Sequence, residues 1–223
     1  MTIHLQREID NLKKLILALG ADVEENVHKA VKSLETRDSQ LAEAIVASDE
    51  VIDEKEVFLE EECLKVLALH QPVAIDLRFV IAVLKINNDL ERISDLAVNI
   101  AERALFLNTQ PKISIPFDFS TMVDKTKSML RSSLDALVRM DTDMAHEVLM
   151  SDDEVDAINK EMYGQVQGGI REHPDQLESL IHYLSTSRHL ERIADHATNI
   201  AEDVIYMVNG EIVRHRAEDF RED

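Results

Sequence analysis

Several residue types are scarce or absent in this chain, and each absence narrows the possible classes of protein. There is no tryptophan, and aromatic residues make up 4% of the sequence. The single cysteine, Cys63, cannot form an intramolecular disulfide, so we expect a small core residue in a reducing compartment. No apolar run is long enough to span a membrane, and the N-terminus interleaves lysine and glutamate with leucine, unlike a signal peptide. The sequence therefore predicts a cytoplasmic protein that meets a membrane only peripherally, through partners.

Glycine and proline are rare as well, with five and four residues respectively. No glycine-rich phosphate loop is present, which excludes nucleotide hydrolysis by a P-loop. There is also no nucleophile elbow and no plausible Ser/His/Asp grouping. The motifs of these two classes of hydrolase are therefore absent from the sequence.

Basic residues are fewer than acidic ones. The chain has 24 lysines and arginines and 44 aspartates and glutamates, which gives a net charge of −20. Such a chain repels phosphate backbones, so nucleic acid is not expected as a partner. An acidic surface suits cations, or a basic face on another protein. For most of the acidic residues, however, the simplest interpretation is that they keep the protein soluble.

Helical periodicity fills most of the chain. The first stretch carries one apolar stripe with steps of three and four residues, formed by Leu5, Ile9, Leu12, Ile16, Leu19, Val23, Val27, Ala30 and Leu34. There is no strong strand signal. The pattern predicts an all-α fold of six long helices in two tandem three-helix bundles, with one continuous six-helix bundle as the alternative.

The breaks in this pattern predict the domain boundaries. Asp38 and Asp141, 103 positions apart, are candidate N-caps of the second and fifth helices. Pro72 is expected in the first turn of the third helix. The predicted segments are a first bundle, a linker with two prolines, a second bundle and a charged C-terminal tail, at residues 1–108, 109–119, 120–210 and 211–223.

The two halves share one nearly identical phrase. Residues 90–102 read LERISDLAVNIAE, and residues 190–202 read LERIADHATNIAE. Both phrases carry the same polar stripe, outside the apolar stripe of the helix. Its members are Glu91, Asp95, Asn99 and Glu102 in the first phrase, and Glu191, Asp195, Asn199 and Glu202 in the second. The chain is therefore a duplicated unit, and the repeated stripe predicts where its chemistry lies.

A second acidic pair precedes each phrase. The pairs are Asp49 with Asp53, and Asp152 with Asp156. In an antiparallel hairpin, residues at equal distance from the turn lie opposite each other. The midpoint between each acidic pair and the Glu/Asp pair of its phrase falls at Pro72 in the first half and beside Pro174 in the second. We therefore expect four carboxylates to meet at one level in each hairpin.

Four adjacent carboxylates repel one another by roughly 1 kcal/mol per pair even in water. A bound cation offsets this repulsion, and carboxylates suit magnesium, calcium, manganese or ferric iron. The predicted metal ligands are Asp49, Asp53, Glu91, Asp95 and Asn99 in one site, and Asp152, Asp156, Glu191, Asp195 and Asn199 in the other. Each site has enough ligands for a multinuclear cluster, with Glu102 and Glu202 as further candidates. The alternative is a pair of solvated acidic patches facing a basic partner.

The histidines add little to this pattern. Glu25 and His28 match half of a di-iron motif, but no second copy exists, and we interpret His28 and His146 as surface residues. His196, beside Asp195, is interpreted as a partly exposed helix residue rather than a ligand. The near-absence of histidine and cysteine in the stripes argues against a zinc-type site.

The two LERIxDxAxNIAE phrases, together with QPVAIDLR at 71–78, resemble the PhoU family of phosphate-uptake regulators. The resemblance covers nearly the whole chain, although the second half reads HPDQLES where the first has QPVAIDLR. Any role of Asp76 and Arg78 is thus confined to the first half of the chain. Asp76 equally fits an acid in the first turn of a helix, where the helix dipole favours negative charge. The resemblance implies two three-helix bundles with a metal cluster in each, containing iron, another transition metal or magnesium.

The resemblance also implies a function. PhoU-like proteins act with the ATPase subunit of the phosphate ABC transporter and with a sensor histidine kinase to repress the phosphate-starvation response, and the family makes a homodimer plausible. We thus expect a metal-binding regulatory adaptor in phosphate homeostasis, without catalysis of its own. Two alternatives remain: a carboxylate-cluster metalloenzyme that hydrolyses phosphoesters, and a structural partner-binding protein without metal.

Overall fold

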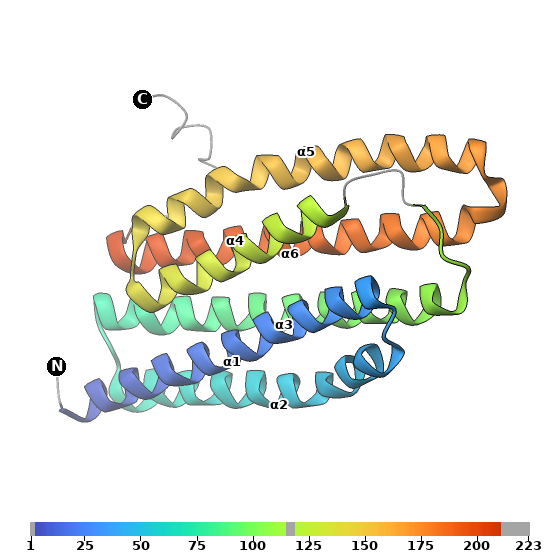
Figure 1. The fold of residues 1–223 in the computed structure, drawn as a ribbon. Helices are drawn as coiled ribbons and strands as arrows, with labels where there is room; N and C mark the ends of the chain where they lie inside the picture. Colours follow the sequence, from blue (N-terminus) through green and yellow to red (C-terminus); the bar gives the residue numbers. More distant parts are fainter. Residues whose placement is uncertain (1–2, 115–118, 211–223) are drawn as a thin grey trace, which may run out of the picture.

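The computed structural model describes residues 3–114 and 119–210 and contains six long α-helices (Figure 1). Helical segments fill these ranges apart from short connections, and no strand occurs within them. The helices are α1 (Ile3–Thr36), α2 (Ser39–His70), α3 (Ile75–Thr109), α4 (Phe119–Arg139), α5 (Thr142–Glu172) and α6 (Leu177–Asn209), and the short 3₁₀ turn η1 (Pro174–Gln176) precedes α6. The predicted all-α fold of two tandem three-helix bundles is confirmed.

The corners α1–α2 and α4–α5 are built in the same way. Asp38 and Asp141 each accept a backbone hydrogen bond at 3.0 Å, from Leu41 N and Met144 N respectively. Each aspartate also donates its own backbone N–H to the preceding helix, at 2.9 Å for Asp38 and 3.0 Å for Asp141. One residue thus ends one helix and begins the next. The predicted caps are confirmed.

The start of α3 corrects the sequence analysis. Pro72 does not lie in the first helical turn, because α3 begins at Ile75 and residues 71–74 form the connection. The N-cap, Ala74, has φ 50° and ψ −118°, a conformation that normally requires glycine. The chain therefore reverses between α2 and α3 through a strained backbone rather than through a proline-initiated helix.

The two bundles lie side by side, with α3 along α6 at the centre and α2 and α5 at the outer edges (Figure 1). Helices α1 and α4 cover the grooves α2/α3 and α5/α6, and they also touch each other. The predicted stripe of α1 is buried, with Ile9 partly so, and one apolar core runs through both bundles. The cores of the two bundles are therefore joined, although each bundle keeps its own three helices.

An approximate two-fold symmetry relates the bundles. Lys85 on α3 binds Asp203 on α6, and the Phe106 ring stacks on His182, so the two helices run antiparallel. Both pairs of residue numbers add up to 288, and residue i in α3 corresponds to residue i plus 100 in α6. Each pair of facing positions on α3 and α6 therefore has a symmetry-related pair, which allows the two ends of this interface to be compared.

Two segments of the predicted organisation stand apart from these helices. The connection after α3 is non-helical at residues 110–114, and the rest of the linker, residues 115–118, lies outside the described part of the chain. The charged tail, 211–223, also lies outside it, directly after the Gly210 cap of α6. Among the described helices, none is both long and apolar enough to cross a membrane.

Candidate functional site

The first hairpin brings the predicted acids of α2 and α3 together at one level. Burial raises the pKa of Asp49 and of Glu91. Charges from the facing helix add to this effect, from Asp95 on Asp49 and from Asp53 and Glu56 on Glu91. In line with these pairs, Asn87 on α3 donates to the backbone oxygen of Glu56 at 2.9 Å. The register predicted from the midpoint at Pro72 is confirmed.

The second hairpin places three carboxylates closer still. One oxygen each from Asp152, Asp156 and Asp195 lies within 4.8 Å of the others, a spacing that a single cation could span. Two of these residues come from α5 and one from α6. The Ser187 hydroxyl donates to Asn159 Oδ1 at 3.1 Å, one turn further toward the hairpin end, and fixes the same register.

Burial and mutual repulsion raise the pKa values of carboxyl groups in the second cluster. The pKa of Asp152 rises to about 6, first because the carboxyl is buried and then because Asp156 and Asp195 carry like charges. Burial followed by the charge of Asp195 also raises the pKa of Glu191. Burial and Asp156 raise the pKa of Asp195, while His196 and Arg192 lower it. The cluster is thus an unfavourable arrangement that a cation would relieve.

The two clusters differ in their ion pairs with arginine. Arg92 lies 3.3 Å from Glu91 Oε2 and 3.2 Å from Asp95 Oδ2, so part of the first cluster already has a positive partner. Arg192, at the equivalent position, forms no ion pair within the described residues. The second cluster is therefore the more open of the two toward an external cation.

Equivalent buried oxygens in both clusters lack a partner. Oδ1 of Asp49 and Oδ1 of Asp152, at corresponding positions of the two halves, accept no hydrogen bond from the described part of the chain. Leaving a buried acceptor unsatisfied costs about 1–3 kcal/mol. A hard cation would satisfy these oxygens directly, so the donor set fits a carboxylate-bound metal ion.

The candidate ligands Asn99 and Asn199, and the outer glutamates Glu102 and Glu202, have different surroundings in the two halves. Asn99 donates to the backbone oxygen of Asp95 at 2.8 Å, and Asn199 donates at 3.1 Å to Asp89 on α3, across the interface between the bundles. Glu102 is exposed and Glu202 is half-buried. Both amide nitrogens thus already donate hydrogen bonds, and a ligand role for Asn99 and Asn199 stays a prediction.

Two residues near the clusters escaped the sequence analysis. Glu56 extends the acidic face of α2 by one turn, and its charge reaches Glu91, whereas the equivalent residue in the second half is Asn159. Asp89 holds both His196, at 2.8 Å, and Asn199. The three-residue step from Asp53 to Glu56 could have indicated the first, but nothing in the repeat pattern indicates the second.

The remaining candidates behave as ordinary structural residues. Glu25 pairs with Lys29 at 3.3 Å, and His28 is exposed, as the sequence analysis expected. Cys63 is fully buried, and its burial raises the pKa of the thiol to about 12. It is a core residue rather than a reactive one.

Together, the fold and these hairpins define a class of tandem-repeat, all-α proteins with paired acidic clusters. The PhoU domain family model matches this chain twice, at residues 16–104 and 119–204. The chain belongs to the PhoU family.

Relatives agree along almost the entire chain. A phosphate-specific transport system accessory protein PhoU homolog from Clostridium acetobutylicum is 34% identical over 209 residues, 93% of this chain and 95% of the relative. A homolog from Aquifex aeolicus is 36% identical over 95% of this chain and 96% of its own length. The crystal structure of PhoU from Pseudomonas aeruginosa matches with a TM-score of 0.88 and 35% identity, over 92% of this chain and 99% of that one.

Proposed function

We propose that this chain is a cytoplasmic, metal-binding regulator of phosphate uptake that acts through recognition rather than catalysis. Relatives over most of the chain carry the description of accessory proteins of the phosphate-specific transport system, which supports a regulatory role. The observation that carries the metal part is the cluster of Asp152, Asp156 and Asp195, whose oxygens lie within 4.8 Å of one another.

The second hairpin would hold the ion through carboxylates of α5 and α6. Asp152 would contribute its unsatisfied Oδ1, with Asp156, Asp195 and Glu191 around it. A bound iron, manganese or magnesium ion would supply positive charge and fix the spacing of the two helices. A second ion, or a multinuclear cluster, would bind at Asp49, Asp53, Glu91 and Asp95, where Arg92 has to move aside.

Partner recognition follows from the shape and charge of the bundles. Long rigid helices present acidic faces, which suit basic surfaces on other proteins. The proposed partners are the ATPase subunit of the phosphate transporter and a sensor histidine kinase, and a second copy of the chain would form a homodimer. Metal binding would regulate these contacts by changing the charge and rigidity of the hairpin faces.

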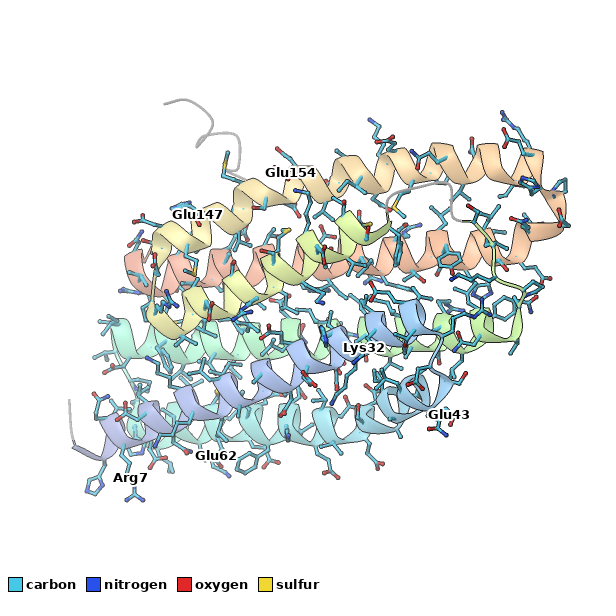
Figure 2. The ribbon with its side chains drawn as sticks, in the orientation of Figure 1. Arg7, Lys32, Glu43, Glu62, Glu147 and Glu154 are labelled. Carbon is cyan, nitrogen blue, oxygen red and sulfur yellow. The ribbon has the colours of Figure 1, made fainter. Side chains whose placement is uncertain are left out.

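Elemental analysis of the full chain, purified without chelator, tests the metal assignment. We expect retained iron, manganese or magnesium, and a loss of metal in Asp152→Asn combined with Asp195→Asn. Glu147→Gln is the matched control, because Glu147 lies exposed on α5 outside the cluster (Figure 2). Equal metal in the parent and the double variant would refute the ligand assignment. Metal-dependent hydrolysis of phosphoesters would instead favour a metalloenzyme.

A further inference from the structure

The approximate two-fold symmetry exposes a difference between the two ends of the α3–α6 interface. At one end two basic side chains face acids: Lys85 Nζ lies 2.7 Å from Asp203 Oδ1, and His196 Nδ1 lies 2.8 Å from Asp89 Oδ1. Asn199 also donates to Asp89. Asp89 and Asp203 thus engage basic or amide groups across this end of the interface, where Arg78 Nε, near Gly210, has no hydrogen-bond partner among the described residues.

At the other end the acids are replaced. The counterparts of Asp203 and Asp89 are Arg103 and His189, and the counterpart of Lys85 is Ser185. His182 lies here too, stacked on Phe106 with ring centroids 3.8 Å apart. We call Arg103, His182, Ser185 and His189 the donor cluster. It is positively charged in a protein of net charge −20.

The donor cluster lacks acceptors. Arg103 Nε, His182 Nδ1 and His189 Nδ1 are buried and have no hydrogen-bond partner among residues 3–114 and 119–210. Ser185 Oγ lies 3.3 Å from His189 Nε2, so this serine is engaged within the cluster. A half-buried guanidinium without an anion is costly, since burial weakens its hydration without supplying a compensating charge.

Electrostatics agree with this description. Burial and Arg103 lower the pKa of His182, against the opposing charge of Glu178. The imidazole of His182 is therefore neutral at neutral pH and can donate one N–H without adding charge.

We propose that the donor cluster between α3 and α6 binds a small tetrahedral oxyanion of the phosphate or sulfate type. Arg103 supplies the charge and the forked donors that match two oxygens of such an ion. The unpartnered Nδ1 atoms of His182 and His189 supply further donors. The donor cluster lies against α3, whereas the acidic cluster of the second hairpin lies between α5 and α6, so the proposal does not depend on the metal site.

Equilibrium dialysis of the full chain against radiolabelled phosphate, with chelator present, tests this site. We expect saturable binding that falls about tenfold or more in Arg103→Gln, because the charged donor is lost. Arg171→Gln, an exposed arginine on α5, is the charge-matched control and should bind like the parent. Displacement by both unlabelled phosphate and unlabelled sulfate would identify the shared oxyanion chemistry, whereas displacement by phosphate alone would identify phosphate as the ligand type.

A second variant keeps the test decisive if Arg103→Gln fails to fold. Ser185→Glu restores an acid opposite Arg103, as Asp203 stands opposite Lys85, and should abolish phosphate binding while raising the melting temperature. Absence of saturable binding in the parent, or undiminished binding in Ser185→Glu, would overturn the proposal. Asp152→Asn should leave phosphate binding intact, so that failure of the metal site and failure of the oxyanion site are distinguishable.

Discussion

At the scale of single residues, burial and mutual repulsion destabilise the charged carboxylates of the acidic clusters. The Asp152 carboxyl is the most strongly perturbed, because burial and two neighbouring carboxylates raise its pKa to about 6. Similar causes act on Glu191 and Asp195. Perturbed carboxylates gathered in this way are more typical of binding sites than of surfaces selected for stability.

This perturbation predicts a pH dependence for the metal-free protein. Between the ordinary value of 3.8 and about 6, the folded Asp152 holds a proton that the unfolded chain has lost. The contribution of this group to folding stability is thus complete below pH 3.8 and is lost as the pH rises through about 6. In Asp152→Asn we expect a flatter fall of unfolding free energy over this range, measured by urea titration. A slope equal to that of the parent would contradict the assignment.

Backbone strain at Ala74 gives a second residue-scale prediction. Because φ is 50° and ψ −118°, replacement by glycine removes a steric penalty that exceeds the entropy cost of glycine. Ala74→Gly should raise the unfolding free energy by about 1 kcal/mol. Ala21→Gly, on an exposed position within α1, is the control and should lower it by about the same amount. Destabilisation by Ala74→Gly would show that the strain is absent in solution.

At the scale of elements, the repeated corners hold consecutive helices together. Asp38 and Asp141 each cap one helix while closing the end of the previous one, and the residues before them, Arg37 and Met140, adopt φ of 56° and 55°. Arg37 additionally donates to Leu107 O and Gln110 O, which joins the α1–α2 corner to the end of α3. The corners are therefore points where several elements depend on one residue.

Removing a cap should cost measurable stability. Asp38→Ala and Asp141→Ala are each expected to lower the unfolding free energy by about 1 kcal/mol, since each loses one side-chain bond to a backbone N–H. Glu161→Ala, exposed in the middle of α5, serves as the control with little expected change. If the cap variants and the control unfolded at the same denaturant concentration, the caps would not contribute.

Element positions could be predicted because each helix carries a long apolar stripe and the caps repeat. The start of α3 could not, since the turn uses Ala74 in a conformation that its residue type does not indicate. The acids of the clusters were predictable from spacing alone, because equal distances from a turn place residues opposite each other. The different ion pairs of Arg92 and Arg192 were not, because the same residue type occupies both positions.

At the scale of the whole molecule, the two halves of the duplication differ in their polar residues at the α3–α6 interface. The pairing of α3 with α6 could not be predicted from the repeated phrases, because its polar contacts involve residues that differ between the halves. Lys85 faces Asp203 at one end, whereas Ser185 and Arg103 occupy the related places at the other. The repeats thus share their acidic clusters and diverge in the interface between them.

Titration of Mn²⁺ into the chelator-treated full chain, followed by electron paramagnetic resonance, tests the central claim most directly. We predict a saturable class of bound Mn²⁺ that weakens at least about tenfold when Asp152→Asn and Asp195→Asn are combined, and that stays unchanged in Glu147→Gln. Binding of equal strength in the double variant, or no saturable binding in the parent, would contradict the claim that acids of neighbouring helices converge to hold a metal ion.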